Sequence, residues 1–370
     1  MSTTSPSVSS AILKQSTLPS ASSGGRRGGM SPNLNWMRTI TPAHFAWTVS
    51  EGRWIPYEHL LYLNRKLVDV AAGRIKRLMV SMPPRHGKSE FISRYFPAWY
   101  LGTYPDKRII LASYEADFAA TWGRKARTLL EEAGPELFGI SVSRVSSAAS
   151  RWDIDGRDGG MATAGVRGPI TGKGAHIAII DDPVKNDQEA NSVTYQEATW
   201  DWYRATFSTR LQDDGAIILV MTRWNENDLA GKLLQAQEDG GDKWEIVRLP
   251  ALAEDDDPLG RKPNEPLCPE LFKREVLEAI KKRIGPYWWN ALYQQRPSPQ
   301  GGAIFKKSMF RYFRRDGSQY VLYTPAGEKR VLQSACWIFQ TVDTAATEKE
   351  TSDYFVCSTW AVTPDKDLLL

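Results

Sequence analysis

The sequence predicts an α/β fold in which a mainly parallel central sheet is flanked by helices. Short apolar runs of strand length alternate with longer segments of helical periodicity, as in βαβ units. One run, within residues 77–92, passes through a tight loop into a helix, and another, at 176–181, ends in two adjacent carboxylates. Because ligands bind at the carboxyl ends of strands in such sheets, we expect both features at one edge.

Length, charge and cysteine content limit the class of protein. The 370 residues can form two domains, and the net charge of +4 with a pI near 8.8 permits a polyanionic partner without requiring one. The three scattered cysteines lack the spacing of a zinc site and favour a reducing compartment. No apolar run approaches the ~18 residues of a membrane span, and the N-terminus lacks a signal-peptide pattern. We therefore expect a soluble intracellular protein with no membrane association.

Residues 82–89 have the features of a phosphate-binding loop. An apolar strand ends at two prolines, and Gly87-Lys88-Ser89 then open a helix. In such loops the amides bind a triphosphate, the lysine reaches its outer phosphates and the serine holds Mg²⁺, so ATP and Mg²⁺ are predicted. The usual pattern has glycine where this chain has Met82, and the alternative is an incidental strand–turn–helix corner. The candidate nucleotide-binding residues are Pro84, Arg85, His86, Gly87, Lys88 and Ser89.

A second motif is the buried strand that ends in Asp181-Asp182-Pro183. Asp181 fits the Mg²⁺-coordinating acid of a Walker B strand, and Asp182 fits the carboxylate that orients or deprotonates the attacking water. That second position is usually a glutamate, so an aspartate requires the water to lie closer. The alternative is a common Asp-Asp-Pro turn. Further strands between the two motifs favour the ATPase class that includes helicases and translocases over nucleotide kinases.

The other predicted elements of this domain, residues 34–297, place two more candidate sites. The stretch at 54–63 leads into an amphipathic helix that extends to about Ala72. Tyr57 and His59 are candidates for contact with adenine; a core aromatic and a surface histidine are the alternatives. The strand at 216–224 ends in Thr222 and Arg223, which we expect to sense the γ-phosphate and couple its loss to a moving subdomain. Strands are expected at 108–113, 160–168 and 244–249, helices at 116–132, 191–212 and 272–295, and irregular chain at 140–160.

Four motifs in order carry a family resemblance: Met82–Glu90, Ile179–Pro183, Met221–Trp224 and Tyr293–Pro297. Together they resemble the large terminase subunit of tailed bacteriophages, the motor that packages DNA into a procapsid. The resemblance implies a P-loop ATPase, a linker at 298–302 and an RNase H-like nuclease from residue 303. It also implies double-stranded DNA, a small terminase subunit and the portal protein as partners, a pentameric ring on the portal, and the host cytoplasm as location.

The family pattern adds further candidate residues. An arginine completes the ATP site, either Arg85 in the loop or, from a neighbouring subunit, Arg124 or Arg167. The nuclease would use Asp343, at the end of a strand at 337–343, and Asp353, with Mg²⁺ or Mn²⁺. Strands at 355–362 and 368–370 would follow. Two-metal cleavage needs more carboxylates than these, so we expect the chain as given to cut DNA poorly.

Two other functional classes are compatible with the ATP motifs, and the chain begins with a low-complexity tail. A helicase-like remodeller would share both ATP motifs, but residues 301–370 are too few for its second RecA-like domain. A degenerate, non-enzymatic subunit would explain Met82 and Asp182, and ATP turnover with and without DNA separates it from a motor. Residues 1–33 are rich in Ser and Gly and bury too little to fold, so they are expected to be disordered.

Overall fold

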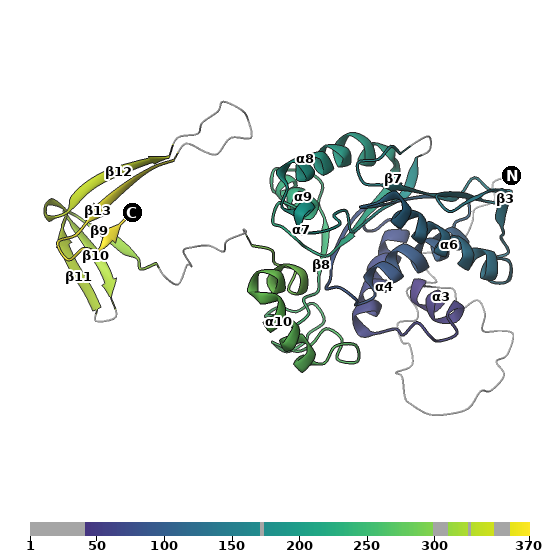
Figure 1. Cartoon of the computed structure of the whole chain (residues 1–370), viewed down its shortest axis with the longest axis horizontal. Coiled ribbons are helices and arrows are strands. Elements are labelled where there is room, and N and C mark those ends of the chain that lie inside the picture. The colour runs from purple at the N-terminus through teal and green to yellow at the C-terminus, as the bar shows by residue number, and fades with distance from the viewer. Residues whose placement is uncertain (1–40, 171–173, 299–309, 325–326, 344–355) are drawn as a thin grey trace. The chain divides into compact units, whose positions relative to one another are not determined.

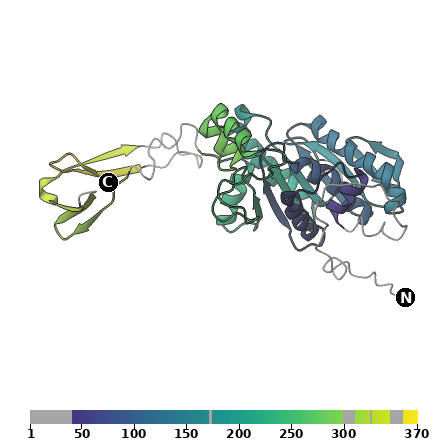
Figure 2. The ribbon, with the colours of Figure 1, turned by 90° about the horizontal axis from the view of Figure 1, so that it is seen from below.

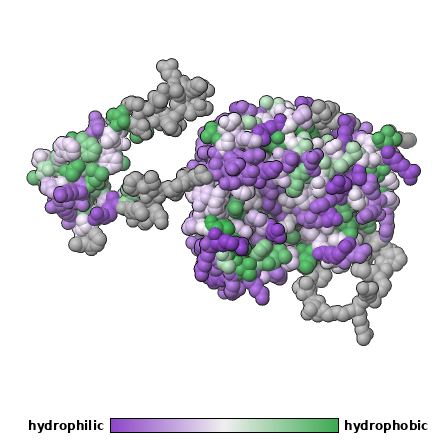
Figure 3. All heavy atoms as spheres, viewed as in Figure 1, coloured by the Kyte–Doolittle hydropathy of each residue, from purple (hydrophilic) through white to green (hydrophobic). Residues whose placement is uncertain are grey.

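The computed structural model describes residues 41–170, 174–298, 310–324, 327–343 and 356–370. The chain divides into two compact units, residues 1–300 and 301–370 (Figure 1). The predicted tail at 1–33, most of the predicted linker and Asp353 lie outside the described residues. No helix in the described parts is long and apolar enough to cross a membrane. The face of the first unit in Figure 3 is mostly hydrophilic, with hydrophobic residues in small groups.

The first unit is built on an eight-stranded sheet in the order β3-β4-β5-β2-β6-β7-β1-β8. All neighbours from β5 to β8 pair in parallel, so the predicted α/β fold with a mainly parallel sheet is confirmed. The strands are β1 (Arg77–Ser81), β2 (Arg108–Ser113), β3 (Val142–Ala148), β4 (Arg151–Ile154), β5 (Gly160–Gly165), β6 (Ala175–Asp181), β7 (Leu211–Met221) and β8 (Glu245–Arg248).

The expectation of irregular chain at 140–160 is wrong. β3 and β4 lie there and extend the sheet by antiparallel pairing. Their polar sequence misled the prediction because an edge strand is largely solvated and does not show the apolar run of a central strand. Val145, for example, is 99% exposed although it lies within β3.

The central strands bury both faces, which explains their continuous apolar runs. Alternate residues enter different cores: Leu78 and Val80 of β1 face one, and Met79 faces the other. The first core is covered by α3 (Pro42–Val49), α4 (Glu58–Ala71), α5 (Phe96–Thr103) and α6 (Ala116–Leu137), and the second by α8 (Val193–Trp202) and α9 (Leu229–Glu238) (Figures 1 and 2). A short helix, α7 (Asp187–Ala190), precedes α8.

Residues 251–298, called here the helical segment, have a small core of their own. It contains Leu252 from a loop, Leu277 from α10 (Arg274–Trp288) and Trp289 from the π-helical turn that follows. The predicted helix at 272–295 is interrupted at Gly285, whose φ of +78° and ψ of 168° are not helical. The helical segment therefore has a core of its own, while Leu267 of the same segment belongs to the first core of the sheet.

The second unit contains two antiparallel sheets, each of three strands. Strands β12 (Trp337–Asp343), β13 (Val356–Val362) and β14 (Leu368–Leu369) match those predicted at 337–343, 355–362 and 368–370. The sequence analysis missed β9 (Phe313–Asp316), β10 (Gln319–Thr324) and β11 (Gly327–Leu332). Charged residues break the alternation that marks a strand in β9 and β11, whereas β10 contains none. Asp343 is the last residue of β12, opposite Val356.

Candidate nucleotide-binding site

The strand order brings three of the predicted motifs together. β7 lies between β6 and β1 and pairs in parallel with both. The carboxyl ends of these strands therefore share one edge of the sheet, where β6 ends in Asp181, β7 leads to Thr222 and β1 leads to the loop at 82–89. Met82, which replaces the usual glycine, is fully buried in the first core, so the loop turns only after it.

The loop has an open, left-handed backbone that suits an anion. Arg85 has a φ of +61° and Gly87 a φ of +84°. Glycine adopts the second value without strain, whereas a side chain there would be strained and would contact Leu60. Among the hydrogen bonds of the described residues, none has the amide of Arg85, His86 or Gly87 as donor. These amides are therefore free to donate to phosphate oxygens.

Two buried histidines hold the loop through hydrogen bonds to its backbone. His59 Nε2–H of α4 donates to the His86 carbonyl at 2.9 Å, and His86 Nδ1–H donates to the Pro84 carbonyl at 2.9 Å. Burial lowers the pKa of both imidazoles to about 4, so they are neutral at pH 7. Since the C=O and N–H of a trans peptide point in opposite directions, fixing the His86 carbonyl inward turns the Gly87 N–H outward.

The position of His59 corrects an expectation. It was a candidate for adenine contact, but it is fully buried and bonded to the loop backbone. The His86 ring is also held, stacked on Phe272 with 5.0 Å between ring centroids, so the ring shapes the loop. The apolar spacing of α4 places His59 on its buried face, which is the signal that could have revealed this role.

Lys88 lies buried at the centre of the three strand ends. Its Nζ is 3.0 Å from Thr222 Oγ1 and 3.2 Å from Asp182 Oδ2. The other oxygen of Asp182 accepts the Thr222 amide at 2.9 Å, and Asp182 itself has a φ of +45°. Backbone strain of this kind persists only where surrounding contacts hold it. A phosphate that binds Lys88 would compete with both of these partners.

Asp181 is the most buried carboxylate of the site, with 0% exposure. It accepts hydrogen bonds from Ser89 Oγ at 2.8 Å and from Ser93 Oγ at 2.7 Å. Burial raises the pKa of Asp181, and the neighbouring Asp182 adds to the rise, while Lys88 opposes it. Ser93 was missed by the sequence analysis, although its position four residues after Ser89 places it on the same helix face.

The residues at this point fit Mg²⁺. The Ser89 hydroxyl and an Asp181 carboxylate oxygen are in contact, and both are the hard oxygen ligands that Mg²⁺ prefers. Bound there, the ion would neutralise phosphate charge. Within the described residues no group of three or more His, Cys, Asp or Glu side chains could hold a metal. A site here would therefore depend on one carboxylate, the serine, phosphate and water.

A cavity of about 530 Å³ opens beside the loop. It is lined by Trp54, Tyr57, Arg85, Gly87 and Arg94, among others. Tyr57 thus lies where a base attached to a bound triphosphate has room, and His59 does not line this cavity. Aromatic and arginine side chains both stack on planar rings.

The remaining candidate residues are placed as follows. Arg223 pairs with the buried carboxylate of Asp228 at 2.9 Å. Arg124 is exposed on α6, and Arg167 is exposed after β5, 3.9 Å above the Tyr195 ring. No ion pair of the described residues links Arg124 or Arg167 to the carboxylates of this site. Asp343 belongs to the second unit.

Several solved structures similar to this chain are phage large terminases. The large terminase of bacteriophage HK97 is 14% identical with a TM-score of 0.42, and the match covers 82% of this chain and 60% of that one. A mutant ATPase domain of a Thermus phage large terminase is 15% identical with a TM-score of 0.45, covering 68% and 97%. The large terminase of a thermophilic bacteriophage in complex with ADP is 9% identical with a TM-score of 0.37, covering 73% and 68%.

The chain therefore spans 60% of the length of the HK97 protein. No match was found among curated proteins. A family model described as "Terminase large subunit, T4likevirus-type, N-terminal" matches residues 79–312, which is more than half of the chain. This range contains the phosphate loop, the paired aspartates and the end of β7. The chain belongs to this family of terminase large subunits.

Proposed function

We propose that this chain is the ATP-hydrolysing motor subunit that moves viral double-stranded DNA into a procapsid. The observation that carries the proposal is the position of Lys88, held between Thr222 and Asp182 at the meeting point of three strand ends. The contact between Ser89 and Asp181 lies beside it. Membership of the terminase family favours DNA packaging over another ATPase task.

Each group has a role in hydrolysis that follows from its contacts. The free loop amides and Lys88 bind the phosphates, and Ser89 and Asp181 hold Mg²⁺. When the γ-phosphate binds Lys88, the ion pair between Lys88 and Asp182 Oδ2 is broken. Asp182 then orients or deprotonates the attacking water. Asp182 is already fixed by the Thr222 amide, so it needs little reorganisation.

The other parts of the site have supporting roles. Pro84, Arg85 and His86 shape the loop, and Arg85 is exposed beside the cavity, where it can approach a phosphate. Tyr57 contacts the adenine in the same cavity. Thr222 reports the γ-phosphate because its hydroxyl contacts Lys88 at 3.0 Å.

The proposal extends to partners and to the second unit. As a terminase large subunit, the protein acts on double-stranded DNA in a pentameric ring on the portal, together with a small terminase subunit, in the host cytoplasm. Arg124 or Arg167 completes the site of a neighbouring subunit. The second unit carries nuclease residues, Asp343 and Asp353, which would bind Mg²⁺ or Mn²⁺. Family membership supports a role in DNA packaging, whereas the ring, the specific partners and the nuclease are part of the proposal for the whole protein.

Steady-state ATP turnover with Mg²⁺, measured with and without linear double-stranded DNA, tests the proposal. We expect turnover that DNA stimulates and that is lost in Lys88→Ala. The matched control is Lys232→Ala, since Lys232 of α9 pairs with Glu197 of α8 and does not contact the site residues. Wild-type turnover no higher than that of Lys88→Ala would refute the proposal in favour of a non-enzymatic subunit. Strand separation of the duplex would favour a helicase-like remodeller.

A further inference from the structure

Gln295 connects the end of β7 to the helical segment. Its Oε1 accepts the Arg223 amide at 3.0 Å, and its Nε2–H donates to the Leu292 carbonyl. The residue is 2% exposed, so both bonds are shielded from water. Gln295 belongs to the motif at 293–297, for which the proposed function gives no role.

The bond to Arg223 places Gln295 one peptide away from Thr222, the residue proposed to sense the γ-phosphate. Lys88 Nζ contacts Thr222 Oγ1 at 3.0 Å, and Arg223 is the next residue along the chain. The Arg223 side chain is held locally by Asp228, so its amide is the group that reaches the helical segment. A change of partner at Lys88 that shifts Thr222 therefore also shifts the hydrogen bond to Gln295.

The backbone of Gln295 is also unusual. Its φ is +56°, a left-handed conformation that is strained for a residue other than glycine. Two nucleotide-site residues, Arg85 and Asp182, share this property. Such strain remains only where contacts hold it, and the two side-chain bonds of Gln295 supply them. Loss of the Arg223 bond would release the turn at which the chain leaves the helical segment.

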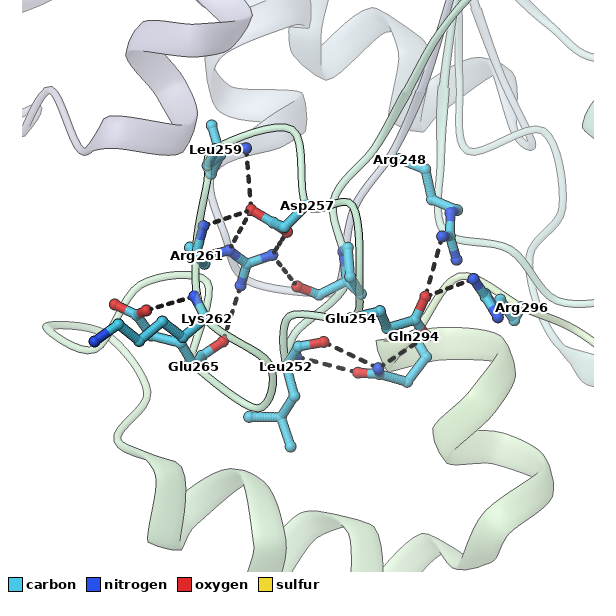
Figure 4. Close-up of polar contacts among 11 residues, drawn as sticks. Arg248, Leu252, Glu254, Asp257, Leu259, Arg261, Lys262, Glu265, Gln294 and Arg296 are labelled. Atoms are coloured by element: carbon cyan, nitrogen blue, oxygen red, sulfur yellow. Dashed lines mark hydrogen bonds and ion pairs between the residues drawn. The ribbon is translucent and has the colours of Figure 1, made fainter.

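The preceding residue provides a natural contrast. Gln294 Oε1 accepts the Leu252 amide at 3.1 Å, and its Nε2–H donates to the Leu252 carbonyl at 3.0 Å and to Glu254 (Figure 4). Arg296 also pairs with Glu254, at 2.8 Å. These bonds stay within the helical segment. Of the two adjacent glutamines, Gln295 bonds to the end of β7 and Gln294 bonds to the loop at 252–254.

We propose that Gln295 is a positioning residue that transmits the nucleotide state from the end of β7 to the helical segment. The inference rests on the proposed function, because it requires ATP and ADP to bind at Lys88. With the γ-phosphate present, Lys88 leaves Thr222 and the 222–223 peptide moves, which alters the bond to Gln295. After hydrolysis the hydrogen bond between Arg223 and Gln295 returns to its nucleotide-free geometry, and the helical segment moves with it.

Hydrogen exchange of the full chain, with Mg²⁺ and either ATPγS or ADP, tests this inference. We expect the exchange of residues 289–298 to differ between the two nucleotides by at least about fivefold, the lower end of typical coupling between sites. Gln295→Met should remove this difference without changing the affinity for either nucleotide. Gln294→Met is the matched control: it should lower the melting temperature and keep the difference.

Four results would count against the inference. If Gln295→Met keeps the nucleotide-dependent difference, or Gln294→Met loses it while binding normally, Gln295 does not transmit the signal. If the wild type binds both nucleotides and residues 289–298 exchange alike, the inference fails and the proposed function stands; this comparison is decisive even if Gln295→Met does not fold. A wild type that binds neither nucleotide refutes the proposed function itself, and the inference with it.

Discussion

Asp181→Asn should stabilise the protein when nucleotide and metal are absent, although it removes a functional group. Asp181 is fully buried, and its charged form faces the like charge of Asp182. Asparagine has nearly the same shape and can keep both bonds, since its oxygen accepts from Ser89 and its amide donates to the Ser93 hydroxyl. The substitution thus removes a buried charge without leaving a polar group unpaired.

The size and the pH dependence of the effect follow from the pKa. Burial raises the pKa of Asp181 from 3.8 to about 7 in the folded protein. The contribution of this group to stability is therefore complete below its unfolded value and is lost as the pH rises through its folded value. Each tenfold change in proton affinity corresponds to about 1.4 kcal/mol, so above pH 7 the ionised Asp181 lowers the free energy of unfolding by at most ~4 kcal/mol. We expect Asp181→Asn to recover about half of this free energy, because the groups around Asp181 relax to accommodate its charge in the wild type.

Thermal unfolding in EDTA between pH 5 and pH 8 measures this effect. A gain of ~2 kcal/mol in the free energy of unfolding should raise the melting temperature of Asp181→Asn by roughly 4–8 °C at pH 8. This increase should become smaller towards pH 5. The control is Asp228→Asn, since Asp228 is equally buried but paired with Arg223, and breaking that pair should destabilise. A melting temperature of Asp181→Asn at or below that of the wild type at pH 8 would refute the reasoning. With Mg²⁺ and ATP added, the same variant should bind nucleotide more weakly than the wild type.

Other substitutions separate binding, chemistry and loop support. Lys88→Ala should abolish hydrolysis in a phosphate-release assay and leave the protein folded by circular dichroism; near-normal turnover would contradict the loop assignment. Asp182→Asn should bind nucleotide normally by fluorescence titration but turn over 10²–10⁴-fold more slowly, as expected for a lost general base; equal rates would mean that another group activates the water. His59→Leu should leave the His86 carbonyl unpaired, cost about 1–3 kcal/mol in urea unfolding and raise KM for ATP more than it lowers kcat; an unchanged KM would show that the loop holds its shape without the histidine.

Local features of the sequence were sufficient to predict the fold class and to suggest the ATP motifs. Apolar runs identify β1, β2, β6 and β7, because a central parallel strand is buried on both faces and has no polar side. The chemistry proposed for Gly87-Lys88-Ser89 and for Asp181-Asp182 was inferred from residue type and from their position at strand ends. β3, β4 and β9 to β11 were missed, because edge and exposed strands carry polar residues that do not alternate clearly.

Only the tertiary structure decided which of these pieces are neighbours. The sequence does not contain the strand order, and it is the place of β7 between β6 and β1 that brings Thr222 to Lys88. The same holds for His59 and for Gln295, whose bonds join residues 27 and 72 positions apart in the chain. A periodic pattern reports which face of an element is buried, whereas hydrogen bonds between elements depend on how those faces pack, and no local pattern records that.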